Sequence, residues 1–239
     1  MDPVRNPFAP GAGTPPPELA GRDSLLELVR IALERARRGL PARSALMVGL
    51  RGVGKTVLLD RMKMAADAAG MQTIRIEAPE ERSLPAILAP ELRLALLRFS
   101  RSAQAVEQAK RALRALAGFA KALKLKYNDI EVGIDYEPEP GLADNGDLEH
   151  DLQSLVEVVG AAAKAAGTVL AMFIDELQYV DEDQLAALID QQVQRVVDGG
   201  FPPVRPSRDA PCVRHPRGLL SVLSGERRAF RRRLLPRPP

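Results

Sequence analysis

The sequence predicts an α/β domain whose core strands are parallel and buried on both faces. Two short apolar runs, residues 45–48 and 168–174, have the unbroken hydrophobicity that such strands require. Both runs are followed by polar residues that can bind or react, and then by a helical pattern, as in repeated strand–helix units. The low aromatic content of 4%, with no Trp, predicts a core of Leu, Val, Ile and Ala, which is common in α/β proteins.

The length and composition limit the class of protein. A chain of 239 residues can hold one sizeable domain with appendages. A single cysteine, Cys212, excludes an internal disulfide and fits a reducing compartment. No apolar run has the length of a membrane span, and the N-terminus lacks the basic and then apolar pattern of a signal peptide. We therefore expect a cytoplasmic protein with no membrane partner.

The net charge of +3 is distributed unevenly along the chain. Residues 201–239 contain ten Arg against one Asp and one Glu, so the remaining chain carries a net negative charge. The high isoelectric point therefore belongs to the C-terminal tail and does not indicate a nucleic-acid role for the main body.

The first segments of the chain are a leader and a helix. Residues 1–17 carry six of the twenty prolines, which predicts an extended leader with little to pack. Apolar residues then recur at helical spacing from Leu25 to Leu33. Either Asp23 or Ser24 can cap the start of this helix, and Gly39 ends it before the first strand.

Residues 49–56 read Gly-Leu-Arg-Gly-Val-Gly-Lys-Thr, which matches the G-x-x-x-x-G-K-T pattern of a phosphate-binding (Walker A) loop. The glycines let successive backbone N–H groups turn inward around a phosphate, the lysine meets the β- and γ-phosphates, and the threonine hydroxyl is a natural Mg²⁺ ligand. The helical pattern over 57–64 completes the strand–loop–helix setting that the motif needs. The alternative is a glycine-rich turn that contains Gly-Lys-Thr by chance. The predicted nucleotide-binding residues are Gly49, Gly52, Val53, Gly54, Lys55 and Thr56, with Thr56 also a metal ligand.

The next segments predict a strand at 72–77, from its alternation, and a helix at 84–99 that is interrupted or restarted near Pro90. Residues 101–126 repeat apolar side chains every three or four positions and are otherwise strongly basic. Such a helix either lies on nucleic acid or a membrane face, or is a solvated amphipathic helix that packs its apolar stripe on the body.

Three further predictions follow that basic segment. Residues 128–136 alternate like a short strand or hairpin arm, and residues 137–147 form an acidic loop with several Pro and Gly. A helix is predicted from about Leu148 to Ala166, ended by Gly167.

The apolar run at 168–174 ends in two adjacent acids, Asp175 and Glu176. A buried strand does not carry adjacent carboxylates unless its end opens into a site. Together with a phosphate loop, Asp175 would hold the Mg²⁺ shell as a metal ligand, and Glu176 would orient and polarise the attacking water as the catalytic residue. The alternative is a solvated strand end, where acids are common. A capped helix is predicted next, over 181–197.

Residues 19–23, 49–56 and 174–178 together resemble the AAA-type P-loop ATPases, specifically the origin-recognition-like group found in many bacterial proteins. The resemblance covers roughly residues 18–200. It implies a three-layer P-loop NTPase fold, with a parallel central sheet flanked by helices, and ATP with Mg²⁺ at the loop. The acids at the end of the apolar strand correspond to the Walker B pair of such ATPases.

Such ATPases continue with another buried strand that ends in a γ-phosphate-sensing polar residue, then a further strand, an arginine finger and a helical lid. None of these can be placed after residue 200, because proline-rich residues 201–206 cannot form a central strand. We therefore expect a domain truncated after the Walker B strand and its following helix, incomplete at its C-terminal side and with an open sheet edge. Residues 201–239 would be a disordered tail, an unrelated extension or the product of a reading-frame change.

The function expected from the sequence is ATP binding by an AAA-type ATPase domain, with hydrolysis slowed or lost through the truncation. Two other classes stay open. One is a regulatory or scaffolding module that binds nucleotide without useful turnover, and the other is a nucleic-acid-binding protein that uses residues 101–126 and the tail. The candidate partners besides ATP are a protein client or DNA, and further copies of the chain in an oligomer.

Overall fold

The computed structural model describes residues 22–40, 42, 44–50, 52–78, 80, 82–124, 136–181, 183–184, 193–197 and 219–226. The predicted leader at 1–17, all but the last residue of the predicted strand at 128–136 and most of the tail lie outside these ranges. The predicted boundaries of leader, domain and tail therefore stay predictions.

The described elements alternate between helices and strands as far as residue 99, and two further helices then precede the next strand. In order they are α1 (Asp23–Arg37), β1 (Ser44–Gly49), α2 (Lys55–Ala68), β2 (Gln72–Glu77), α3 (Leu84–Phe99), α4 (Val106–Lys124), α5 (Leu148–Ala165), β3 (Leu170–Asp175), the short 3₁₀ helix η1 (Leu177–Tyr179), β4 (Val193–Val197) and β5 (Leu219–Glu226). The predicted helices and strands at 25–33, 45–48, 57–64, 72–77, 84–99, 148–166 and 168–174 are confirmed. The predicted break in α3 is wrong, because the helix runs through Pro90.

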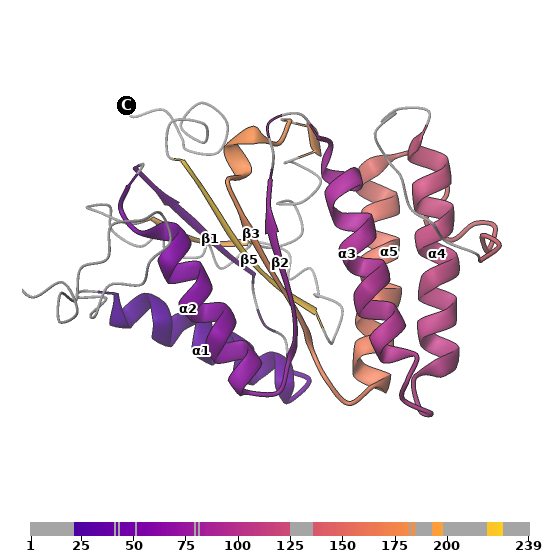
Figure 1. Ribbon diagram of the computed structural model, residues 1–239, viewed down its shortest axis with the longest axis horizontal. Coiled ribbons are helices and arrows are strands. Elements are labelled where there is room, and N and C mark those ends of the chain that lie inside the picture. Colours follow the sequence, from indigo (N-terminus) through magenta and orange to yellow (C-terminus); the bar gives the residue numbers. More distant parts are fainter. Residues whose placement is uncertain are drawn as a thin grey trace, which may run out of the picture.

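The five strands form one parallel sheet in the order β2-β3-β5-β1-β4. Helices α1 and α2 cover one face of the sheet, and α3, α4 and α5 lie on the other side (Figure 1). The predicted parallel sheet flanked by helices is therefore present, and all of its strands point their carboxyl ends to the same edge.

Alternate residues of β1 enter two separate cores, which explains its unbroken hydrophobicity. Ala45 and Met47 pack with α1 and α2, whereas Leu46 and Val48 pack with the helices of the opposite face. A strand covered on both faces must be apolar at every position, since neither side meets water. The run at 45–48 therefore has the environment that its composition predicts.

The apolar stripe of helix α4 is buried in the hydrophobic core of the protein. Leu113, Leu116 and Phe119 are buried in the core that α4 shares with α3 and α5, while Arg111 and Arg114 are exposed. The packing supports the interpretation of a solvated amphipathic helix, because the apolar stripe is already covered. Its basic face stays exposed, and a nucleic-acid role for that face stays a prediction.

The prediction that no strand follows residue 200 is wrong for residues 219–226. These residues form β5, which lies between β1 and β3, and Val222 is only 1% exposed. The strand is an eight-residue run without proline, and the Pro and Arg around it dominate the composition of the tail. The sheet is consequently continuous from β3 to β1, and the open edge expected there does not exist.

The prediction of a helix through residue 197 is also wrong at its end. Val193–Val197 form β4, which pairs in parallel with β1 at the end of the sheet. Three of these five residues are valines, whose branched side chains favour strands when a partner strand is available. Helix is present at residues 183 and 184, and residues 185–192 lie outside the described part of the chain.

Replacing Val222 with alanine is expected to lower the free energy of unfolding by about 2 kcal/mol, because it leaves a cavity in the middle of the sheet. Urea unfolding followed by circular dichroism measures the change. Arg114→Ala, on the exposed face of α4, is the control and should stay within about 0.5 kcal/mol of the parent chain. Equal stability of the Val222 variant and the parent would show that β5 does not belong to the sheet.

Candidate nucleotide-binding site

The loop between β1 and α2 has the backbone conformation that the Walker A pattern predicts. Gly52 and Gly54 have φ angles of 78° and 81°, in the left-handed region that glycine adopts without strain. Gly54 is the N-cap of α2 and has no side chain to accept from the first N–H groups of the helix. These donors and the positive end of the helix dipole therefore remain directed at the loop, which is the arrangement that binds phosphate.

Two positively charged side chains donate hydrogen bonds to backbone carbonyl oxygens of this loop. The Lys55 Nζ donates to the Leu50 carbonyl oxygen at 2.8 Å, so the ammonium group lies over the loop. The Arg22 guanidinium donates to the Val53 carbonyl oxygen at 2.9 Å. Arg22 immediately precedes α1, and this contact ties the N-terminal segment of the domain to the loop. A small cavity here is lined by Arg22, Leu25, Met47, Val48, Val53, Gly54, Lys55 and Leu58.

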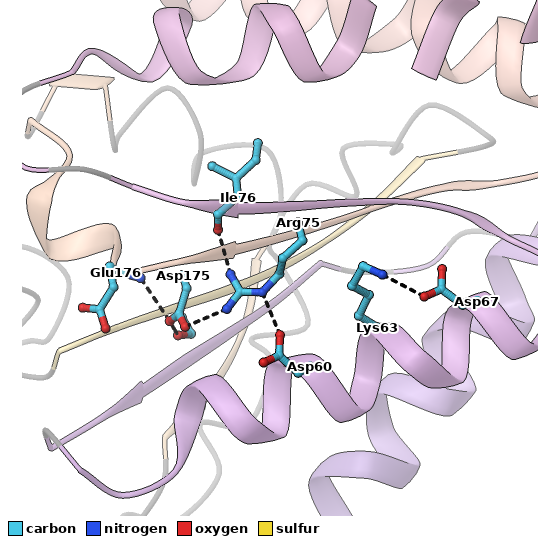
Figure 2. A network of polar contacts seen from close by, with 8 residues as sticks. Asp60, Lys63, Asp67, Arg75, Ile76, Asp175 and Glu176 are labelled. Atoms are coloured by element: carbon cyan, nitrogen blue, oxygen red, sulfur yellow. Dashed lines mark hydrogen bonds and ion pairs between the residues drawn. The ribbon is translucent and has the colours of Figure 1, made fainter. Parts of the chain in front are cut away.

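Asp175 ends β3 and is 1% exposed. Its Oδ1 accepts from the backbone N–H of Glu176 at 3.0 Å and from the Ser224 hydroxyl of β5. Its Oδ2 accepts from the Arg75 guanidinium of β2 at 3.1 Å (Figure 2). A buried carboxylate needs such partners, because desolvation otherwise makes its charge costly. Asp175 is therefore fixed by groups from both neighbouring strands.

Arg75 and Ser224 are site residues that the sequence analysis missed. Arg75 occupies a polar position of an alternating strand, where an arginine is unremarkable by pattern alone. Ser224 belongs to the tail, where the many Pro and Arg residues led to the prediction that no strand is present. The signal that could have found Ser224 is the short proline-free run of Leu, Val and Ser at 219–224, since a central strand of this fold class needs only such a run.

Glu176 has a backbone conformation that is rare for a residue with a side chain. Its φ is 56° and its ψ is 35°, in the left-handed region, which costs on the order of 1 kcal/mol or more. The turn separates its carboxylate from that of Asp175, and Glu176 Oε2 accepts from the Gln178 side chain. Strained residues of this kind cluster at functional sites, where the surrounding structure holds them in place.

The two motifs meet at the carboxyl edge of the sheet. β5 pairs Ser224 with Met47 of β1 and Leu223 with Ile174 of β3, so Asp175 lies one strand away from the end of β1. Residues 49–56 and the acids at 175–176 are far apart in the sequence, but both emerge from this edge. In open parallel sheets, ligands bind outside the carboxyl ends of the strands.

The oxygen atoms available at this edge suit Mg²⁺, which prefers hard oxygen ligands and keeps several waters. The Thr56 hydroxyl at the start of α2 and the Asp175 carboxylate are the protein groups that fit this role. Among the residues described by the structure, no cluster of three or more His, Cys, Asp or Glu could hold a metal by itself.

A family model described as AAA ATPase domain matches residues 18–195 of the chain. This match includes the loop at 49–56, the acids at 175–176 and Arg75. No curated protein matches the chain significantly. In the described part of the chain, no helix combines the length and apolarity that crossing a membrane requires.

Proposed function

Because this chain belongs to the AAA ATPase domain family, we propose that it binds ATP with Mg²⁺ at residues 49–56 and hydrolyses it with the help of Glu176. We further propose that it belongs to the origin-recognition-like group, on the basis of residues 19–23 and 174–178. The observation that carries the proposal is the common edge of the sheet. This edge carries the loop after β1, which contains two glycines in the left-handed conformation, and the buried Asp175 at the end of β3, with β5 between the two strands.

The predicted nucleotide-binding residues of the loop each have a physical role in this proposal. The backbone N–H groups and the α2 N-terminus cradle the phosphates, and the Lys55 ammonium compensates charge on the β- and γ-phosphates. Mg²⁺ would neutralise phosphate charge and would be held by Thr56 and Asp175. The N–H groups belong to Gly49, Gly52, Val53, Gly54, Lys55 and Thr56.

The residues at the strand ends act on the water and on the metal ligand. The Glu176 carboxylate accepts a hydrogen bond from the attacking water and polarises it as a general base. The Ser224 hydroxyl holds Asp175 in position by donating a hydrogen bond to its Oδ1. We expect slow turnover by the chain alone, since an arginine finger supplied in trans contributes about 10³–10⁵ in rate.

Titration of the folded full chain with a fluorescent ATP analogue and Mg²⁺ tests the proposal. The expected result is saturable binding of one nucleotide per chain, with competition by unlabelled ATP. A sample that is folded by circular dichroism but does not bind ATP would refute the proposal. Binding without hydrolysis would instead favour the regulatory or scaffolding module as the function.

The nucleic-acid alternative remains a prediction with its own test. Fluorescence anisotropy with a DNA duplex at two salt concentrations distinguishes it, since phosphate contacts must weaken as ionic strength rises. On α4, Lys110 pairs with Glu107 and Arg111 approaches Glu139, which reduces the charge that these residues offer to DNA. A protein client and an oligomer likewise remain proposals.

A further inference from the structure

Arg75 bridges two acids that come from different layers of the fold. Its Nε pairs with the Asp60 carboxylate of α2 at 2.8 Å, and its Nη2 pairs with the Asp175 carboxylate of β3 at 3.1 Å. Its Nη1 donates to the Ile76 carbonyl oxygen at 2.8 Å. Figure 2 shows the guanidinium between Asp175, at the end of its strand, and Asp60, on the helix that follows the phosphate loop.

We propose that Arg75 is a built-in counter-cation of the metal site: it lowers the affinity of the nucleotide-free protein for divalent cations, so that the metal is captured together with the nucleotide phosphates. This inference rests on the proposed function, because it concerns the same site. It goes beyond that function because it assigns to Arg75 the role of preventing the metal from binding before the nucleotide.

The Asp175 carboxylate is in direct contact with a positive charge. Both of its oxygens already accept hydrogen bonds, and the charged one comes from Arg75. An arginine guanidinium stays protonated at all relevant pH values, so its positive charge beside Asp175 is permanent. A divalent cation that approaches this carboxylate therefore meets a fixed positive charge that contacts the same group.

The size of the repulsion between Arg75 and a bound metal follows from Coulomb's law. At separations of several ångströms and effective dielectric constants of about 20 to 80, repulsion between a unit charge and a divalent ion corresponds to roughly tenfold or more in affinity. The nucleotide reverses this balance, because its phosphates bring several negative charges to the metal. Metal and nucleotide then bind with positive coupling, and by linkage each raises the affinity for the other.

A purely structural role for Arg75 makes the opposite prediction. If Arg75 only tethers α2 to β3, its removal loosens Asp175 and weakens metal binding. If Arg75 is a counter-cation, its removal leaves Asp60 and Asp175 with uncompensated charge and strengthens metal binding. The sign of the change therefore distinguishes the two roles.

The experiment measures Mn²⁺ binding to the full chain without nucleotide, by the electron paramagnetic resonance signal of free Mn²⁺. Arg75→Gln is expected to bind Mn²⁺ about tenfold or more tightly than the parent chain. Arg75→Lys keeps the charge and should stay within about threefold of the parent. Adding Asp175→Asn to the Arg75→Gln chain should remove the gain. An affinity for Mn²⁺ that is unchanged or lower in Arg75→Gln would overturn the proposal.

Asp60→Asn provides a second test if Arg75→Gln does not fold. Asp60 is 44% exposed at its side chain, and the amide keeps the shape of the group. With Asp60 neutral, the Arg75 charge acts on Asp175 alone, so Mn²⁺ affinity in the presence of ADP is expected to fall several-fold. No change would overturn the proposal. ATP binding in the presence of Mg²⁺, measured on the same samples, is the separate readout of the proposed function, and its loss in every sample, the parent chain included, would refute that function alone.

Discussion

Replacing Lys55 with alanine is expected to weaken ATP binding by a factor of about 100 to 1,000 in a chain that stays folded. The Lys55 ammonium lies over the phosphate loop, where it donates to the Leu50 carbonyl oxygen. It would exchange this contact for charge-assisted bonds to phosphate, which are among the stronger polar interactions in proteins. Alanine is a favourable helix former at the first position of α2, so the fold should be retained.

The control for this change is another lysine of the same helix. Lys63 pairs with Asp67 on the surface of α2, about two helical turns beyond the loop. Lys63→Ala should leave ATP affinity unchanged in the same fluorescence titration. If Lys55→Ala binds ATP as tightly as the parent chain, residues 49–56 do not form the phosphate site.

The second large effect concerns hydrolysis. Glu176→Gln is expected to retain ATP binding and to lower the turnover rate by a factor of about 100 to 10,000, which is the usual contribution of a general base. The glutamine amide cannot take a proton from the attacking water, although it keeps the size of the side chain. Its carbonyl oxygen can still accept from Gln178, so the local turn is expected to remain.

Single-turnover release of phosphate measures the effect even when steady-state turnover is slow. Glu157→Gln, on the exposed face of α5, is the matched control and should hydrolyse ATP like the parent. Equal rates for Glu176→Gln and the parent would remove the catalytic assignment. The nucleotide-binding module without useful turnover would then be the better description.

The parts of the fold that the sequence could predict depend on local patterns. Residues 45–64 combine an apolar strand, a glycine loop and a helix within a short stretch, and the loop needs specific residues at fixed positions. Asp175 was predictable because a carboxylate at the end of an apolar strand requires a partner or a site. Both features are determined by residues that lie close together in the chain.

The parts that could not be predicted depend on pairings between distant residues. β5 joins the sheet because β1 and β3 both offer unpaired edges, and no local signal shows that a run inside an Arg/Pro-rich tail fills this position. The same holds for β4, where pairing with β1 prevails over a helical pattern. The contacts of Arg75 with Asp60 and of Ser224 with Asp175 exist only after these strands have assembled.

The central claim is that the phosphate loop and the acid at the end of β3 act on one metal-bound triphosphate. The most direct test is the effect of Mg²⁺ on ATP affinity in the parent chain and in Asp175→Asn, measured by titration with and without EDTA. Mg²⁺ is expected to tighten ATP binding in the parent and to have a much smaller effect in the variant. The same gain from Mg²⁺ in both chains, or a folded parent chain that does not bind ATP, would contradict the central claim.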